Sequence, residues 1–155
     1  MLMSYSTKKL SNNDNYYTPK IAWQYIIDYI PKDKVIWEAF YGDGSSGKYL
    51  TELGLTVVCQ NVDFFSNNLG EIVVSNPPFS DTIRILTRLK ELEKPFILLM
   101  PSARVHAQYV KRLFGNGLQI IVPPKRIQFN NEGKCSFDCL YFCWKMALER
   151  DLVFL

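Results

Sequence analysis

The chain has 155 residues, of which 48% are hydrophobic and 21% are charged, and its formal net charge is +3. This balance is ordinary for a soluble, single-domain globular protein with a sizeable core, and the mild positive charge permits an acidic partner such as nucleic acid. No apolar run approaches the roughly 20 residues of a membrane span, and the start lacks the apolar segment of a signal peptide. These features exclude membrane and secreted proteins, so we expect an intracellular protein, cytoplasmic or in a host cell or virion.

Helical apolar stripes alternate with short apolar runs along the chain. Residues 1–15 are polar and predict a flexible arm, and Thr18 with Pro19 predicts the cap and first turn of a helix. The predicted helices span residues 18–30, 48–53, 81–94 and 103–114. The predicted strands span residues 35–37, 55–59, 72–75, 96–100 and 118–122.

The last part of the chain predicts a closing antiparallel hairpin, built from residues 127–129 and 135–146. The alternation of strands and helices before it favours an α/β fold with a mostly parallel sheet and helices on both faces. We expect residues 1–155 to form one domain.

The tetrapeptide Asn76-Pro77-Pro78-Phe79 follows a predicted buried strand, so it stands where α/β folds place their sites. The prolines fix two φ angles and remove two donors, which leaves stiff backbone carbonyls as acceptors. Asn76 adds a side-chain acceptor and Phe79 a flat apolar face. This combination suits a planar group that carries an –NH2, either a nucleobase amine or a side-chain amide. The alternative is a plain proline turn that closes the strand.

A glycine-rich turn, residues 42–47, joins a predicted strand to a predicted helix, where backbone N–H groups can hold an anion. Residues 42–48 also match the opening of a nucleotide-triphosphate-binding loop. That loop requires Ser or Thr next, and here the residue is Tyr49. An ATPase and a plain strand–turn–helix therefore stay open as alternatives at this turn.

The cysteines and the charged pairs carry weaker signals. Cys135, Cys139 and Cys143 are spaced by four, but their segment is aromatic and apolar, and His106 is the only histidine, so we expect core thiols and no metal site. Two basic pairs are candidate phosphate contacts, with a solvated basic face as the alternative. These pairs are Lys111 with Arg112 and Lys125 with Arg126.

In their order and spacing these segments resemble S-adenosylmethionine-dependent adenine (amino group) methyltransferases. The closest forms are the small ones of phages and large DNA viruses, which lack a target-recognition domain. The motifs that carry the resemblance are residues 15–19, 38–44, 63–65 and 76–79. Residues 126–129 and the aromatic segment after them also recur in such proteins.

The resemblance implies a Rossmann-like class I methyltransferase fold, S-adenosylmethionine as cofactor and adenine in nucleic acid, DNA above all, as substrate. It implies a catalytic role for Asn76, Pro77, Pro78 and Phe79. It implies that the cofactor-binding residues are Tyr17, Thr18, Pro19, Glu38, Phe40, Gly42, Asp43, Gly44, Asp63 and Phe64. In such a site Asn76 and the Pro77 carbonyl would hold the two hydrogens of the amine and align its lone pair with the methyl group.

The chain departs from the family pattern at two places. Ala39 stands where proline is usual, and the second strand ends in Cys59-Gln60-Asn61 without the acid that binds the ribose. Asp63 and Gln60 are both candidates for that contact. The alternatives for function are methylation of an RNA base or a protein glutamine, and an inactive nucleic-acid-binding or scaffold homologue. A homodimer or a partner subunit is a further expectation, because so small a chain offers limited surface for a duplex.

Overall fold

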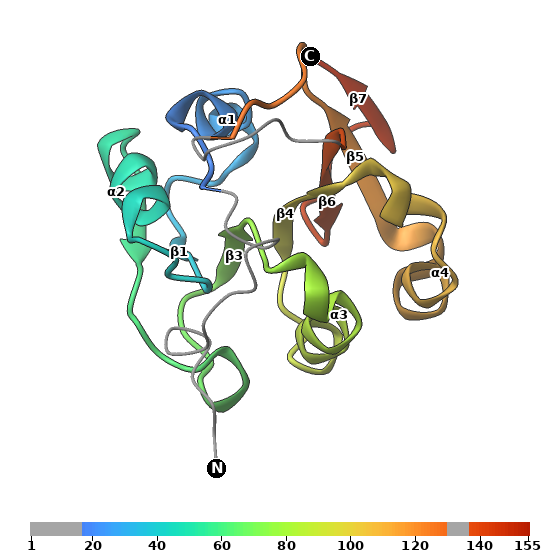
Figure 1. The fold of residues 1–155 in the computed structure, drawn as a ribbon, viewed down its shortest axis with the longest axis horizontal. Helices are drawn as coiled ribbons and strands as arrows, with labels where there is room; N and C mark the ends of the chain where they lie inside the picture. The colour runs from blue at the N-terminus through green and yellow to red at the C-terminus, as the bar shows by residue number, and fades with distance from the viewer. Residues whose placement is uncertain (1–16, 130–136) are drawn as a thin grey trace.

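The computed structural model describes residues 17–129 and 137–155. In these ranges seven strands form one sheet in the order β2-β1-β3-β4-β6-β5-β7 (Figure 1). The strands are β1 Val35–Trp37, β2 Thr56–Val58, β3 Ile72–Ser75, β4 Phe96–Pro101, β5 Leu118–Val122, β6 Cys139–Trp144 and β7 Leu152–Phe154. The first four pair in parallel, β6 is antiparallel to both β4 and β5, and β7 is parallel to β5. The predicted α/β class and mostly parallel sheet are thus confirmed.

Helices cover both faces of the sheet. The helices are α1 Lys20–Gln24, α2 Ser45–Glu52, α3 Thr82–Glu91 and α4 Gln108–Phe114. In Figure 1, α1 and α2 lie on one side of the strands, and α3 and α4 lie on the other. Each pair closes its own apolar core, with Trp23 and Leu50 in the first core and Leu86 and Phe114 in the second. The prediction of helices on both faces is therefore confirmed.

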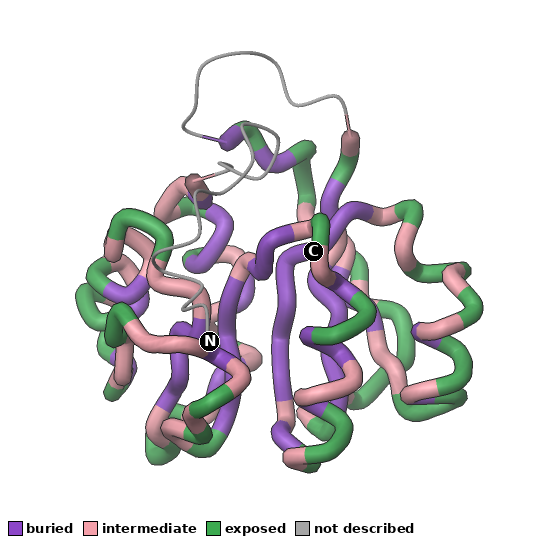
Figure 2. The backbone as a smooth tube through the Cα atoms, turned by 60° about the horizontal axis from the view of Figure 1, so that its bottom comes forward, coloured by how far each residue is buried: buried purple, intermediate pink, exposed green. Residues whose placement is uncertain are grey.

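Consecutive strand residues feed the two cores in turn. On β1, Ile36 belongs to the first core and Trp37 to the second, and on β3, Val74 belongs to the first and Val73 to the second. This is the two-residue period of a strand that is covered on both faces. Figure 2 shows the result, with buried backbone along the central strands and exposed backbone on the outer sides of the helices.

The order of the strands creates a point where the chain changes direction. From β1 the chain first goes to β2 on one side and then returns to β3 on the other side of β1. Connections that leave two adjacent strands in opposite directions open a crevice beyond their carboxyl ends, and open α/β sheets bind ligands there. The residues that follow Trp37 and Ser75 occupy this position.

The predicted closing hairpin is wrong, because the strand expected over residues 127–129 does not form. Residues 127–129 are not a strand, and β6 pairs instead with β4 and β5. Pro123 and Pro124 follow β5 directly and cannot donate to a sheet, so the chain leaves the sheet there. Ile127 and Phe129 are buried in the first core without being in a strand. Strand β7 was not predicted from the sequence.

Three helices are shorter than predicted, and the one expected over 81–94 is α3, Thr82–Glu91. The first ends at Gln24 and is followed by a 3-10 turn, Ile27–Tyr29, because Ile26 leaves the helical backbone at φ −111° and ψ 4°. Pro19 rather than Thr18 takes the cap position of α1. The helix expected over 103–114 is divided by Ala107, whose extended backbone separates a 3-10 segment, Ser102–His106, from α4.

Within the described ranges, no helix combines the length and the apolar character needed to cross a lipid bilayer.

Candidate active site

A buried carboxyl group joins the carboxyl ends of β1 and β3. Glu38 is 1% exposed, and its Oε1 accepts hydrogen bonds from the hydroxyl of Ser75 and from the N–H of Phe40, the latter at 3.0 Å. Burial raises the pKa of Glu38 from 4.5 to about 8, although both hydrogen bonds lower it. The group is therefore mainly protonated at neutral pH. It lies directly after β1, where the chain goes first to β2 on one side and later to β3 on the other.

Asn76 connects the predicted catalytic tetrapeptide to the amino-terminal motif. Its Nδ2 donates a hydrogen bond of 2.9 Å to Oγ1 of Thr18, 58 residues earlier in the chain. Thr18 is 3% exposed, so this hydroxyl is fixed by packing rather than by solvent. The bond sets the direction in which the Asn76 amide is turned. Thr18, predicted as a helix cap, thus accepts a hydrogen bond from the tetrapeptide and does not cap α1.

The tetrapeptide itself is rigid and partly covered. Pro77 and Pro78 are buried, whereas Asn76 and Phe79 are half-buried. Phe79 opens a short 3-10 turn, and its carbonyl accepts a bond of 3.0 Å from the hydroxyl of Thr82. Its ring meets the ring of Phe137 edge to face, with the centroids 5.3 Å apart. The structure therefore fixes both the backbone and the ring plane of Phe79.

The glycine-rich turn after β1 starts α2 in close contact with β2. Gly44 is the cap of α2 at φ +83°, which favours glycine, and its N–H donates to the carbonyl of Tyr41 at 2.8 Å. At Gly47 a Cβ atom would lie 2.5 Å from both Cβ and Sγ of Cys59, so no side chain fits between the helix and the strand end. Gly47 is not among the residues predicted to bind the cofactor, although the spacing of Gly42, Gly44 and Gly47 matches the dinucleotide-binding pattern G-x-G-x-x-G.

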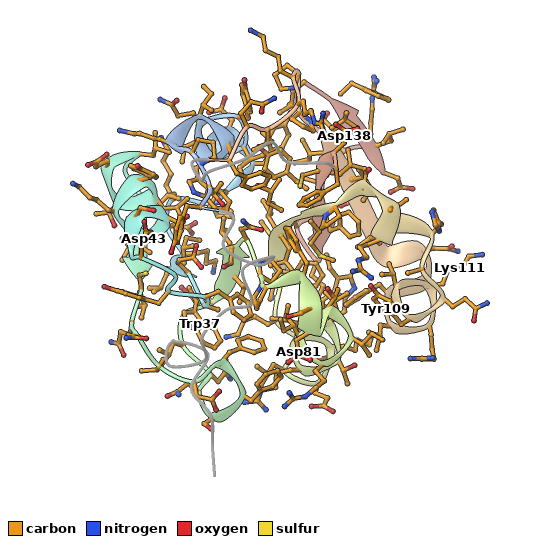
Figure 3. The ribbon with its side chains drawn as sticks, viewed as in Figure 1. Trp37, Asp43, Asp81, Tyr109, Lys111 and Asp138 are labelled. Carbon is orange, nitrogen blue, oxygen red and sulfur yellow. The ribbon has the colours of Figure 1, made fainter. Side chains whose placement is uncertain are left out.

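Two more predicted residues lie around this turn. The ring of Tyr17 comes within 3.9 Å of where a Cβ of Gly42 would be, so the segment before α1 reaches the turn. Asp43 is exposed, and its Oδ1 accepts bonds from the N–H and the hydroxyl of Ser45 at 3.0 and 2.6 Å. Figure 3 shows Asp43 beside α2. Its carboxylate therefore stabilises the start of that helix.

The nucleotide-triphosphate alternative gains no support from this turn. Lys48 is exposed on α2, and Tyr49 packs against the first core. The position where a Mg²⁺-binding hydroxyl would stand is thus occupied by a ring that contributes to folding.

Asp63 and Phe64 follow β2 and differ in the atoms that they make available to a ligand. Oδ2 of Asp63 accepts a bond of 2.5 Å from the hydroxyl of Ser66, while Oδ1 is buried and has no hydrogen-bond partner among the described residues. Phe64 is 0% exposed, stacked on Trp37 at 5.5 Å and packed against Phe40 at 4.8 Å. This ring lies inside the second core, and the predicted cofactor contact of Phe64 stays a prediction. A half-buried ring, Phe40, lies above it.

The two candidates for ribose binding, Gln60 and Asp63, differ in burial. Gln60 is exposed, and its backbone carbonyl accepts the N–H of Val62 at 2.9 Å. Asp63, by contrast, carries the buried oxygen without a partner in the described part of the chain. The structure thus gives Asp63 the stronger case as a ligand contact.

The four predicted phosphate contacts do not gather into one patch. Lys111 and Arg112 are exposed on α4, and Figure 3 places Lys111 on its outer side, well apart from Asp138. Arg126 forms an ion pair of 3.0 Å with Asp138. Lys125 is exposed beside it. The two pairs therefore lie at different places on the surface.

Sequence reasoning gave no role to Arg104, which lies closer to the tetrapeptide. Its Nη2 donates to the carbonyl of Phe79 at 3.5 Å, from the 3-10 segment after β4. The only signal in the sequence is its place just after a predicted strand next to the tetrapeptide strand, and the sheet order was needed to see that.

The cysteines of β6 belong to the first core. Cys139 and Cys143 are buried, and burial raises the pKa of Cys143 to about 12. Cys135 lies outside the described residues, as do residues 1–16 with the predicted arm. Over the ranges 17–129 and 137–155, no three His, Cys, Asp or Glu side chains are grouped in a way that could hold a metal ion.

A cavity of about 580 Å³ lies away from all of these residues. Its lining consists of Asp28, Tyr29, Met146, Ala147, Leu148, Glu149, Arg150, Leu152, Val153 and Phe154. None of the residues predicted for catalysis or binding is among them. The structure therefore does not connect this cavity with the residues predicted for catalysis or binding.

No protein-family model matches the chain, and no curated protein is found to match it. A function must therefore be argued from the residues and their geometry.

Proposed function

We propose that the protein is an S-adenosylmethionine-dependent methyltransferase with a Rossmann-like class I fold. Its acceptor would be the exocyclic amine of adenine in nucleic acid, with DNA favoured over RNA. One observation carries the proposal. Three segments far apart in the sequence, around Thr18, Glu38 and Asn76, are joined by side-chain hydrogen bonds at the carboxyl ends of β1 and β3.

The fold supports a ligand at this place. The crevice beyond the carboxyl ends of β1 and β3 is the position where open α/β sheets bind nucleotides. Gly42 and Gly44 both have positive φ, as the tight turn of the G-x-G-x-x-G pattern requires, and Gly47 makes the close helix–strand contact. The ring of Tyr41 lies 3.1 Å from where a Cβ of Gly44 would be, so a cofactor at this turn would meet aromatic side chains as well as backbone.

The residues present fit S-adenosylmethionine. Asp63 offers a buried carboxylate oxygen without a partner in the described ranges, which suits an amine donor of a ligand. Glu38 offers a buried acid below the glycine-rich turn, and a cationic ligand would favour its ionised form. When bound, S-adenosylmethionine supplies an electrophilic methyl group on a sulfonium.

Asn76 and Pro77 would do the catalytic work. The exocyclic nitrogen of adenine is a poor nucleophile because its lone pair is delocalised into the ring. Hydrogen bonds from its two hydrogens to Oδ1 of Asn76 and to the Pro77 carbonyl would favour a pyramidal nitrogen whose lone pair is free to attack. Thr18 holds Nδ2 of Asn76 at 2.9 Å and so keeps Oδ1 as the acceptor. Such preorganised acceptors act mainly in the transition state and need no histidine.

Phe79 would hold the target base. A base inside a duplex must leave the stack before its amine can be reached, and stacking on an aromatic ring compensates part of that cost. The edge-to-face contact with Phe137 fixes the plane of the Phe79 ring before any base arrives. The four residues of the tetrapeptide thus divide into acceptors and a stacking surface.

The proposal is tested by transfer of a labelled methyl group from S-adenosylmethionine to duplex DNA, single-stranded DNA and RNA in parallel. We expect label in 6-methyladenine, and we expect Asn76→Ala to lower the turnover by about 100-fold or more, by comparison with the loss of one transition-state hydrogen bond. Cofactor affinity, measured by calorimetry, should change far less, because Asn76 acts on the acceptor.

Asn116→Ala is the matched control, since Asn116 is exposed in the 3-10 turn after α4. Equal losses of turnover and of cofactor affinity in Asn76→Ala would refute the role of Asn76. Cofactor binding without label on any nucleic acid would refute the proposed acceptor, and absence of cofactor binding would refute the proposed chemistry.

A further inference from the structure

Arg104 brings a positive charge to the edge of the site. It lies in the 3-10 segment Ser102–His106, directly after β4, and β4 is the neighbour of β3 on the side away from β1. Its guanidinium donates to the carbonyl of Phe79 at 3.5 Å. One arm of this cation is therefore directed at the backbone of the residue that would carry the target base.

The charge of Arg104 is not neutralised by a neighbour in the described part of the chain. Two other arginines near the site are paired, Arg84 with Asp81 at 3.1 Å and Arg126 with Asp138 at 3.0 Å. Arg104 belongs to none of the ion pairs among the described residues, and its side chain is half-buried. A half-buried arginine without a carboxylate partner keeps guanidinium N–H groups available to an anion.

The surroundings of Arg104 suit a large partner better than a small anion. Val105 and His106, its neighbours, are exposed, and Val105 keeps 39% of its surface in solvent. No acidic residue occurs between Ser102 and Phe114. This stretch of surface can therefore approach a polyanion without like-charge repulsion.

The basic pair on α4 is placed differently. Val110 and Phe114 anchor α4 in the second core, and Lys111 lies on the outer side of the helix (Figure 3). None of the described contacts joins Lys111 or Arg112 to the tetrapeptide. A phosphate on this pair would have no fixed position relative to Phe79.

We propose that Arg104 binds a phosphate of the nucleic-acid substrate next to the target nucleotide, and thereby positions the base on Phe79. This inference rests on the proposed function and adds the contact that locates the strand. The planar guanidinium can use one N–H on the Phe79 carbonyl and direct a second edge at phosphate oxygens. The distance between phosphate and base would then be set by one side chain.

The test is binding of a fluorescein-labelled 14-mer, as duplex DNA, single-stranded DNA and RNA, followed by anisotropy at several NaCl concentrations. Arg104→Gln should weaken binding of the preferred nucleic acid about tenfold at 50 mM NaCl and should lower the slope of log K against log salt by about 1. Arg104→Lys, which keeps the charge, should restore most of the slope. Arg150→Gln is the matched control, because Arg150 is exposed on the connection from β6 to β7.

Calorimetry with S-adenosylmethionine separates this inference from the proposed function. Unchanged cofactor affinity in Arg104→Gln, together with the weaker binding of nucleic acid, supports the phosphate contact. Loss of cofactor affinity alone would place Arg104 at the cofactor and overturn it. An unchanged salt slope in Arg104→Gln with a reduced slope in Lys111→Gln would also overturn it, while methyl transfer by the unaltered protein would leave the proposed function standing.

Discussion

The sheet has a polar half, at the carboxyl ends of β1 and β3, and an aromatic half, around β4, β5 and β6. At the carboxyl ends of β1 and β3, polar side chains such as Thr18, Glu38 and Ser75 are buried and bonded across long stretches of sequence. Around β4, β5 and β6 the packing is aromatic, with Phe96, Phe114 and Trp144 in mutual contact at 5.1 to 6.0 Å between ring centroids.

This difference separates the source of stability from the site of chemistry. Burying an ionisable group such as Glu38 costs free energy in its charged form, whereas burying a large ring contributes about 1.5–3 kcal/mol. The free energy gained by burying rings in the aromatic half therefore offsets the free energy lost in the polar half. Mutations in the two halves should accordingly affect different measurements.

The largest loss of stability should come from the aromatic half. Phe142 on β6 is 1% exposed and packs in the second core, so Phe142→Ala should lower the free energy of unfolding by about 3–5 kcal/mol. Urea denaturation at 25 °C measures this change. Leu152→Ala on β7 is the control, because Leu152 is 49% exposed and should cost far less. A loss below 1 kcal/mol for Phe142→Ala would show that the aromatic half does not carry the stability.

The buried acid should make the polar half sensitive to pH. The pKa of Glu38 is about 8 in the folded protein and has its ordinary value of 4.5 when unfolded, so the folded state holds the extra proton between these values. The contribution of Glu38 to stability is then greatest below pH 4.5, falls as the pH rises to 8, and is constant above that.

Glu38→Gln keeps an acceptor for Ser75 and Phe40 but cannot ionise. At pH 7 it should raise the free energy of unfolding by about 2 kcal/mol, and it should flatten the decline between pH 4.5 and 8. Thermal unfolding followed at half-unit pH steps gives both results. If the two proteins lose stability in parallel over this range, the pH dependence comes from another group.

The close contact between α2 and β2 gives a smaller effect that bears on both halves. In Gly47→Ala, the added Cβ meets Cys59 at 2.5 Å and must displace the helix or the strand end. We expect a loss of about 1–3 kcal/mol in stability, as for other overpacked sites, and a larger relative loss of cofactor affinity. Calorimetry and urea denaturation of the same preparation compare the two. Full cofactor affinity in this variant would show that the contact serves packing alone.

The mildest expected change concerns the bond from Asn76 to Thr18. Thr18→Val keeps the shape of the side chain and removes the acceptor, so it should cost about 1 kcal/mol in stability at most. Turnover should fall by about tenfold, because the Asn76 amide is then free to turn. Thr18→Ser should restore the turnover. Equal activity of all three proteins would show that packing alone orients Asn76.

The parts of the fold that the sequence predicts are those fixed locally. Strands β3 and β5 were predicted with the bounds Ile72–Ser75 and Leu118–Val122, because each is a continuous apolar run between residues that break structure. The short strand β7 was missed because its three residues have no such boundaries and pair only when β5 is already in place.

The sequence can propose residues for the candidate site but not the connections between them. The tetrapeptide and the glycine-rich turn have recognisable chemistry, and their roles stay predictions. That Thr18 bonds Asn76 rather than capping α1, and that Arg104 lies at Phe79, depends on the order of the strands. Phe64 was assigned to the cofactor through the resemblance of residues 63–65 to a family motif, and the sequence alone did not show that its ring is buried.

The insertion of β6 between β4 and β5 has a consequence for how the chain reaches its native state. Strand β5 touches β4 only through β6, so it has no place in the sheet until β6, a later segment, has been synthesised. On the ribosome, β1 to β4 with their helices can assemble first. The apolar side chains of β5 stay exposed until β6 has been synthesised. Contacts between distant segments slow folding and prolong exposure of apolar surface. The part of the sheet made by β5, β6 and β7 should thus form last, and a chain released before β6 should be a target for chaperones and proteases.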